Sequence, residues 1–294
     1  MSPSRSGTAY GIAAYALWGL FPLFWPLLEP AGPLEVLAHR VLWSLVVVGA
    51  LLAFGVASVR GLRRDQVLRL SVAAVLLAVN WGTYIYGVNS GQVVETSLGY
   101  FINPLVSVGL GVVVLGERLR PVQRVAIGIA TVAVVILTIQ AGHPPVLALV
   151  LAFSFGTYGL LKKQAGVGAV ASLAVETAVL APVALGYVLV LGAVGDSTFA
   201  SHGADHALLL ASAGLVTTVP LLAFGAAATR IPLSTLGVLQ YLAPTLQLFC
   251  GLFVAHEAFG VPQAVGFGLV WVALILFTSD LVRSHRRPVV VAAA

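Results

Sequence analysis

The residues of this sequence that could do chemistry are a few polar side chains inside long apolar segments. Arg40 and Glu176 are the charged residues placed clearly within such segments, each about five residues, or about 8 Å, from a segment end. Embedding a charge in an apolar layer costs free energy, so each is a candidate substrate or proton-coupling site. The plainer interpretation is that each side chain extends to the polar boundary of the layer.

A second set of candidates combines amide and aromatic side chains within the same apolar segments. Asn and Gln deep in an apolar helix usually hydrogen-bond to a neighbouring helix, and this is the plainer interpretation of each one alone. Taken together, aromatic walls with a few amides suit a cavity for a modest organic solute. The cavity candidates are Trp18, Asn80, Tyr84, Tyr100, Asn103, Tyr158, Gln240 and Tyr241.

Motifs for enzymatic chemistry are missing from the sequence. It has no Gly-rich phosphate loop ending in Lys-Ser/Thr, and His256-Glu257 has no second histidine at the metalloprotease spacing. Its single cysteine, Cys250, excludes an intramolecular disulfide and a cysteine-based metal cluster. We therefore expect no catalytic residues, no metal site and no cofactor.

The composition explains where these side chains must sit. Of 294 residues, 60% are hydrophobic and only 9% are charged, against about 25% charged in a soluble domain. Apolar runs of about twenty residues are typical of membrane-spanning helices, because lipid offers the backbone no hydrogen-bond partners. We predict an all-α polytopic protein with ten spans: 8–28, 35–55, 69–90, 96–115, 122–139, 145–163, 171–193, 206–227, 233–254 and 262–282.

The distribution of basic residues predicts the orientation. With ten spans, fourteen of the fifteen Lys and Arg residues fall in the loops and ends on the side that carries both termini. Arg40 is the exception. The positive-inside rule then places both termini in the cytoplasm of a bacterial plasma membrane protein. The net charge of +5 is explained by these loops, so we expect no nucleic-acid partner.

An internal repeat divides the chain into residues 1–140 and 141–294. Five residues recur at an offset of 140, from Pro104 to Gly128 in the first copy and from Pro244 to Gly268 in the second. The copies fall on spans four and five and on spans nine and ten, so the repeat unit is five helices. An odd number of helices inverts the second copy across the membrane, as in many secondary transporters.

The repeat also sets expectations for the embedded charges and prolines. Inversion places Arg40 and Glu176 at different depths, their Cα atoms more than about 10 Å apart in a core of about 30 Å, so a direct pair is not expected. Pro104 and Pro244 occupy matching places and are hinge candidates, because proline removes a helical hydrogen bond; a static bend is the alternative. The expected partners are Glu95 for Arg40, and Lys162, Lys163 or Arg230 for Glu176.

Longer strings in the sequence carry a family resemblance that covers nearly the whole chain. They are His39–Ser44, Asn80-Trp81, Ser97–Leu105, Leu115–Arg118, Val216–Leu222 and Leu233–Gly237 continuing to Gln240-Tyr241. With these strings the chain resembles the EamA branch of the drug/metabolite transporter superfamily, and within it the RarD group. The resemblance implies a helical bundle with a central cavity that transports small metabolites or drugs, often outward.

Together these observations predict a secondary active transporter, most simply an exporter, that moves a small organic metabolite or drug by alternating access. Proton coupling is the first hypothesis for its energy source. The expected partners are a small-molecule substrate and membrane lipids, and a homodimer is left open. Two other classes remain as alternatives: a non-transporting membrane scaffold or sensor, and an amphiphile or lipid flippase.

Overall fold

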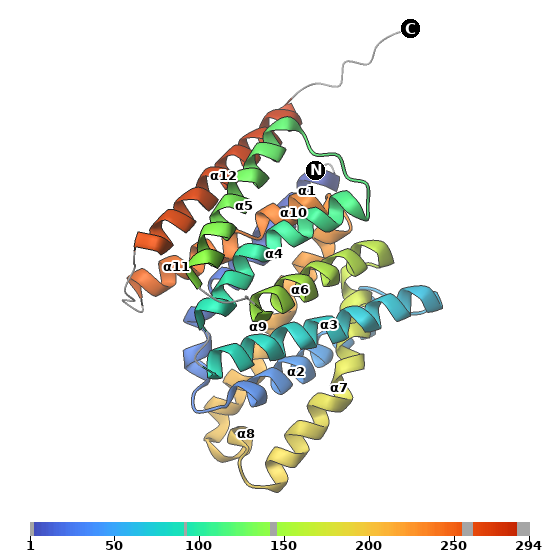
Figure 1. Cartoon of the computed structure of the whole chain (residues 1–294). Coiled ribbons are helices and arrows are strands. Elements are labelled where there is room, and N and C mark those ends of the chain that lie inside the picture. Colours follow the sequence, from blue (N-terminus) through green and yellow to red (C-terminus); the bar gives the residue numbers. More distant parts are fainter. Residues whose placement is uncertain (1–2, 91–92, 142–145, 255–260, 287–294) are drawn as a thin grey trace.

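The computed structural model describes residues 3–90, 93–141, 146–254 and 261–286, and every regular element in these ranges is helical (Figure 1). The first part contains α1 (Pro3–Gly19), the 3-10 turns η1 (Phe21–Leu23) and η2 (Trp25–Leu28), α2 (Pro33–Ala53), α3 (Arg64–Asn89), α4 (Val93–Val113) and α5 (Pro121–Ala141). The second contains α6 (Val146–Ala165), α7 (Ala169–Ala193), α8 (Thr198–Ser201), α9 (Gly203–Ala228), α10 (Leu233–Leu239), α11 (Leu242–Phe253) and α12 (Val261–Arg286).

Five helices, α2, α3, α6, α7 and α9, are long and apolar enough to cross a membrane. Shorter apolar stretches lie in α4, α5 and α12, at Leu98–Val113, Pro121–Ile136 and Ala264–Phe277. The backbone of each helix is hydrogen-bonded within itself, which is the condition for crossing lipid. The chain is therefore an all-α protein with several membrane-spanning helices.

The first predicted span, 8–28, is not one continuous helix. α1 ends at Gly19, and the segment continues as two single 3-10 turns. Pro22 and Pro26 explain the break, because each lacks an N–H and its ring clashes with the carbonyl of the residue four positions earlier. The tighter turns place Phe21 and Trp25 beside α2, where they matter for the site described below.

The ninth predicted span, 233–254, is also interrupted, between α10 and α11 at Gln240 and Tyr241. Pro244 removes the N–H that would bond to the Gln240 carbonyl, and the Ala243 amide instead reaches that carbonyl at 3.2 Å in a tighter turn. Pro104, at the matching place in the repeat, leaves α4 continuous. The two hinge candidates therefore differ: only Pro244 adjoins a break in its helix.

Helices from the two parts of the chain pack against each other throughout the bundle. α2 packs on α7, α4 on α10, α5 on α12, α3 on α6 and α1 on α9. Figure 1 shows α5 and α12 side by side at one edge, and α7 with α8 toward the opposite edge. The bundle is therefore interleaved rather than built from two separate lobes.

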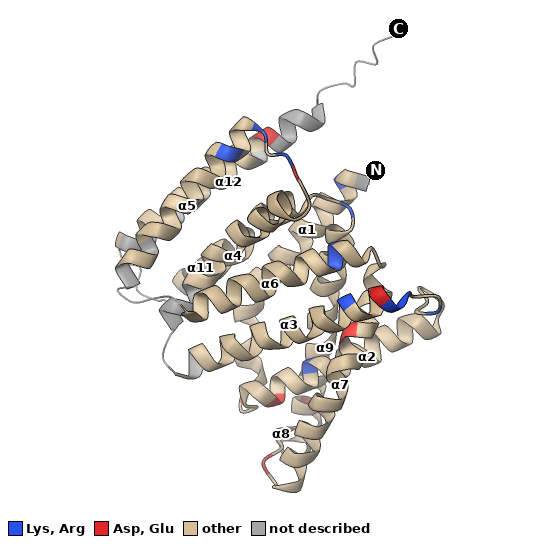
Figure 2. Cartoon of the chain, turned by 45° about the vertical axis from the view of Figure 1, so that its right-hand side comes forward, with Lys and Arg blue, Asp and Glu red and all other residues tan. Residues whose placement is uncertain are grey.

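Contacts at the helix ends show which ends lie together. The Glu117 carboxylate, in the loop between α4 and α5, accepts hydrogen bonds from the amides of Leu233 and Ser234 at the start of α10, at 2.6 and 2.8 Å. In the same region Arg120 pairs with Asp280 near the end of α12 at 3.0 Å. Lys and Arg gather toward this side of the bundle (upper right in Figure 2).

At the opposite ends of the helices, a carboxylate that the sequence analysis did not single out joins α2 to α8. Glu35 is only 2% exposed, and its oxygens accept hydrogen bonds from the Thr198 amide at 2.8 Å and the Thr198 hydroxyl at 2.9 Å. The Ser197 hydroxyl adds a third bond at 3.2 Å. Glu35 is the first residue of predicted span 35–55, and no sequence pattern distinguished it from a residue at the membrane boundary.

Close helix packing depends on glycine where α10 meets α4. A Cβ atom on Gly237 would lie 2.9 Å from the Pro104 carbonyl oxygen and 2.9 Å from the Ser107 Cβ. Backbone oxygen cannot move aside as the end of a flexible side chain can, so a larger residue would force the helices apart. Gly109, on the same helix α4, has no neighbour within 4 Å of the position of a Cβ atom.

We predict that Gly237→Ala destabilises the purified protein by about 1–3 kcal/mol, the usual effect of overpacking. Gly109→Ala is the matched control and should be neutral or stabilising by up to about 1 kcal/mol, because Ala favours helix over Gly. Thermal unfolding in detergent measures both. Equal melting temperatures for the two variants would contradict the close approach of α10 to α4.

Candidate functional site

Arg40 lies in an aromatic box formed by three segments of the chain. Its guanidinium carbon is 4.7 Å from the ring centre of Trp25 in η2 and 4.4 Å from that of Trp81 in α3. The ring of Phe21 is 5.9 Å away, and the Nε–H donates to the Thr217 hydroxyl of α9 at 2.9 Å. Cation–π contacts of this kind contribute about 2 kcal/mol when they are desolvated. The box therefore fixes the position of the guanidinium.

The box supplies Arg40 with rings and a hydroxyl, but no described carboxylate pairs with it. Glu35, five residues earlier on α2, is engaged by the segment around Thr198. The side chain of Glu95, the partner expected from the sequence, lies outside the described residues. Arg40 itself is partly exposed, so the rings do not enclose it completely.

Three of the predicted cavity residues lie in α3 and α4 beside this box. Tyr84 is one turn beyond Trp81 on α3, and its ring meets that of Tyr100 edge to face with centres 5.9 Å apart. Asn103 is one turn beyond Tyr100 on the same face of α4. It is only 4% exposed, and its Oδ1 accepts no hydrogen bond from the described residues. A buried amide oxygen without a partner is uncommon, which marks Asn103 as a candidate site residue.

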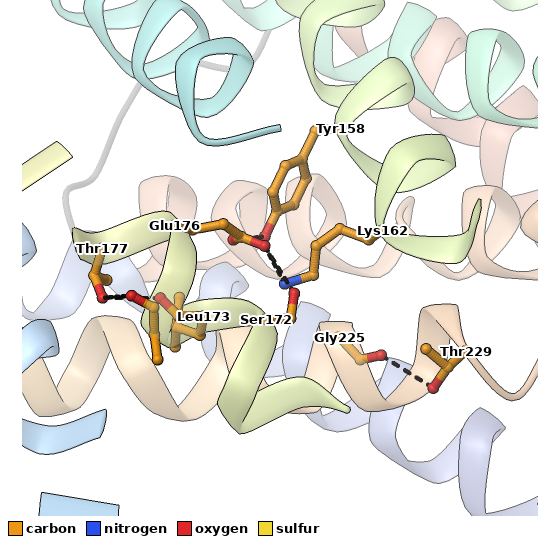
Figure 3. Close-up of polar contacts among 9 residues, drawn as sticks. Tyr158, Lys162, Ser172, Leu173, Glu176, Thr177, Gly225 and Thr229 are labelled. Carbon is orange, nitrogen blue, oxygen red and sulfur yellow. Dashed lines mark hydrogen bonds and ion pairs between the residues drawn. The ribbon is translucent and has the colours of Figure 1, made fainter. Parts of the chain in front are cut away.

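Glu176 has a different environment, shown in Figure 3. Its carboxylate pairs with Lys162 at 2.7 Å and accepts hydrogen bonds from the hydroxyls of Tyr158 at 3.1 Å and Ser172 at 2.9 Å. Glu176 and Lys162 are 1% and 3% exposed. The expected pairing of Glu176 with a basic residue is confirmed, and Lys162 is the partner.

The two embedded charges occupy equivalent places. Arg40 is the eighth residue of α2 and Glu176 the eighth residue of α7, and these helices pack on each other. Glu176 receives Lys162 from the preceding helix, whereas Arg40 receives Trp25 from the segment that precedes α2. Tyr158, four residues before Lys162, donates a hydrogen bond to Glu176, and Phe21, four residues before Trp25, lies against Arg40. The position on α7 therefore holds an ion pair, whereas the position on α2 holds a cation against aromatic rings.

An aromatic cluster lies deeper in the bundle, where α1, α6 and α9 meet. Trp18 contacts Tyr15 and Phe155 with ring centres 5.5 and 5.8 Å apart. Tyr158 stacks on Phe224 at 5.5 Å and is fully buried. Of the predicted cavity residues Trp18 and Tyr158, only Trp18 is partly exposed.

Other predicted cavity residues bind neighbouring helices. The Asn80 amide donates to the Leu151 carbonyl of α6 at 2.9 Å, and the Tyr241 hydroxyl donates to the Phe101 carbonyl of α4 at 3.2 Å. Gln240 is buried at the break between α10 and α11. A small apolar hollow between α4, α5, α10 and α12 is lined in part by Pro104 and Tyr241, and by none of the residues around Arg40.

Sequence reasoning missed one member of these sites, Trp25, whose ring faces Arg40. Lys162 was one of three basic residues expected to pair with Glu176, and the structure shows that it is the partner and that it is buried. Pro22 and Pro26 could have indicated this position of Trp25, because prolines break a helix and change the direction of the side chains that follow.

Comparison with known proteins places this arrangement in a family. The profile of the EamA-like transporter family matches residues 5–139. Over 96% of the chain the sequence is 57% identical to Protein RarD of Streptomyces exfoliatus, of which it covers 91%. It is 39% identical to Protein RarD of Escherichia coli K12, with 97% of each chain covered. The chain belongs to the EamA-like transporter family.

The relatives of this EamA protein also support its general role. An uncharacterized transporter of Bacillus subtilis, YojE, is 44% identical over 96% of this chain and 97% of its own. A solved crystal structure superimposes with a TM-score of 0.70 at 20% identity, covering 93% of this chain and 98% of that one. The structural likeness shows the fold alone. The sequence relatives identify the chain as a RarD-type membrane transporter.

The ion pair in this EamA protein gives a test of stability. Glu176→Gln leaves the Lys162 ammonium buried without a countercharge, and we expect a loss of about 3–5 kcal/mol in the free energy of unfolding. The double variant Lys162→Met with Glu176→Gln removes both charges and keeps an acceptor for Tyr158. It should recover most of the loss in thermal unfolding. A double variant no more stable than Glu176→Gln would show that the charges are not balanced against each other.

Proposed function

We propose that this protein is a secondary active transporter, working as an exporter, that moves a small organic metabolite or drug by alternating access. The observation that carries the proposal is that the contacts between the two parts of the chain come in matching pairs. If α1, α3 and α4 correspond to α6, α9 and the α10–α11 pair, the contact of α1 with α9 matches that of α6 with α3, and the contact of α4 with α6 matches that of α11 with α1. The contacts of α2 with α7 and of α5 with α12 each join two corresponding helices.

These matching contacts support two inverted five-helix halves, 1–140 and 141–294, and ten spans in total. α4 and the α10–α11 pair cover residues exactly offset by the sequence repeat, 93–113 and 233–253, and α5 and α12 begin at 121 and 261. In transporters built from inverted repeats the solute site lies near mid-bilayer between the halves, and the halves rock about it. The break before Pro244 provides a place where α10 and α11 could bend.

The proposed solute site is the region of Arg40, Tyr84, Tyr100 and Asn103. Aromatic rings there supply apolar contact, and the Asn103 oxygen supplies a free acceptor. This combination suits a concave site for an organic molecule. The outward direction of transport rests on the resemblance to the EamA branch alone.

A ligand screen and vesicle flux together test the proposal. We expect a metabolite, amino acid, nucleoside or amphenicol drug to raise the melting temperature of the purified protein. Saturation at a hundredfold excess over the dissociation constant stabilises the folded state by about 2.7 kcal/mol. Asn103→Ala and Tyr84→Ala should abolish the shift while the unliganded melting temperature stays close to wild type. Absence of flux of that solute in proteoliposomes would favour the scaffold or flippase interpretation.

Proton coupling is assigned to Glu176, whose carboxylate would exchange its partner Lys162 for a proton during the cycle. Because Glu176→Gln alone leaves a buried ammonium, the informative variant is Lys162→Met with Glu176→Gln. Transport by this double variant should lose its dependence on pH. Tyr158→Phe removes one hydrogen bond to the carboxylate and keeps the ion pair, so it is the matched control. A pH profile that is unchanged in the double variant would make the pair structural.

The proposed orientation places both termini in the cytoplasm of a bacterial plasma membrane. It predicts opposite labelling of two exposed serines in a Cys250→Ser background. A cysteine at Ser201, in α8, should react with an impermeant maleimide in intact spheroplasts, and one at Ser58, between α2 and α3, only after lysis. The reverse pattern would invert the proposed topology.

A further inference from the structure

Arg40 combines a fixed position with unused hydrogen-bonding capacity. An arginine side chain carries five N–H donors, and here the Nε–H is bound by Thr217. Within the described residues the Nη nitrogens donate to no acceptor, although the Trp25 and Trp81 rings lie 4.7 and 4.4 Å from the guanidinium carbon. The fork formed by the Nη nitrogens is the geometry that binds a carboxylate with two parallel hydrogen bonds.

The equivalent place in the second half shows what such a charge requires. Glu176 is neutralised by Lys162, and two hydroxyls complete its hydrogen bonds. At Arg40 the position corresponding to Lys162 is occupied by Trp25, which cannot neutralise a cation. Glu35, on the same helix, is occupied by the α8 segment. The protein therefore holds a cation where its other half holds an ion pair.

We propose that the countercharge of Arg40 is the carboxylate of the transported solute, so that the substrates are organic acids with an apolar or aromatic body. This inference rests on the proposed transport function and names its substrate class. Arg40 binds the carboxylate, and the rings of Trp25, Trp81 and Tyr100 contact the apolar body beside it. An organic cation is excluded from the box by repulsion, and a neutral solute leaves the guanidinium fork without an anionic partner.

The other anions able to neutralise Arg40 are a lipid phosphate and the Glu95 carboxylate. The box favours a solute, because three aromatic rings surround the guanidinium and would also contact the solute body, whereas a headgroup requires polar surroundings. Each alternative makes a separate experimental prediction, so both serve as arms of the test.

The test compares ligands of matched shape on the full-length protein in phosphatidylcholine nanodiscs. The probes are benzoate, phenylacetate and indole-3-acetate, each with its neutral amide, and phenethylammonium as the cation. Binding of the benzene-based probes is followed by intrinsic tryptophan fluorescence, since Trp25 and Trp81 flank the site, and binding of every probe is followed by thermal shift; indole-3-acetate and its amide, which fluoresce as tryptophan does, are followed by thermal shift alone. We expect at least one acid to bind at least tenfold more tightly than its amide, and phenethylammonium not to bind.

The variants assign that selectivity to Arg40. Arg40→Gln should weaken binding of the acid at least tenfold, and Arg40→Lys should restore part of it, because a lysine keeps the charge but not the fork. Arg60→Gln removes the same charge from an exposed loop residue and should change nothing. Glu95→Gln should leave acid binding unchanged, and acid binding at least tenfold tighter in this variant would identify the Glu95 carboxylate as the countercharge instead. Circular dichroism and gel filtration establish that each variant is folded.

Three further results would overturn the inference. One is equal affinity of every acid and its amide, and another is acid binding that survives Arg40→Gln. The third is loss of acid binding when phosphatidylglycerol replaces phosphatidylcholine in the wild type and no recovery in high salt, which screens surface repulsion; this would assign the site to an anionic lipid headgroup. Proteoliposomes separate this inference from the transport proposal. Acid binding at Arg40 without flux refutes transport alone, and flux of a neutral solute by Arg40→Gln at the wild-type rate refutes the substrate class alone.

Discussion

The lack of water inside a bilayer is the constraint on which this structure depends. A polar group placed between these helices cannot be hydrated, so it must find a partner within the protein or in a ligand. Asn80 bonds to the backbone of α6, and Tyr241 bonds to the backbone of α4. Glu35 and Glu117 bind backbone amides at the starts of α8 and α10. Each of these bonds also fixes one helix against another.

The two embedded charges show two solutions to the same problem at equivalent places. Glu176 is held in a closed arrangement, since Lys162 balances its charge and the hydroxyls of Tyr158 and Ser172 donate to its oxygens. Arg40 is held in an open arrangement, since the rings of Trp25 and Trp81 fix the guanidinium without cancelling its charge.

The surroundings of a proline decide whether its helix stays continuous. Pro104 and Pro244 match in the repeat, yet α4 is continuous and the equivalent segment is divided into α10 and α11. Proline weakens both helices in the same way, so the outcome is set by what surrounds each one. Gly237 brings α10 against the backbone of α4 close to Pro104, which buries that part of α4 against a rigid neighbour.

The sequence by itself determined that this is a helical membrane protein with an internal repeat, because composition, apolar run length and residue spacing are properties of the chain. It also predicted a basic partner for Glu176, with extension of the side chain to the membrane boundary as the alternative. Only the tertiary structure decided that this partner is Lys162, that the first span ends at Gly19, and that Arg40 lies against Trp25 and Trp81. The physical reason is that these contacts join residues distant in the sequence, whose separation is set by helix packing and by breaks at proline rather than by local pattern.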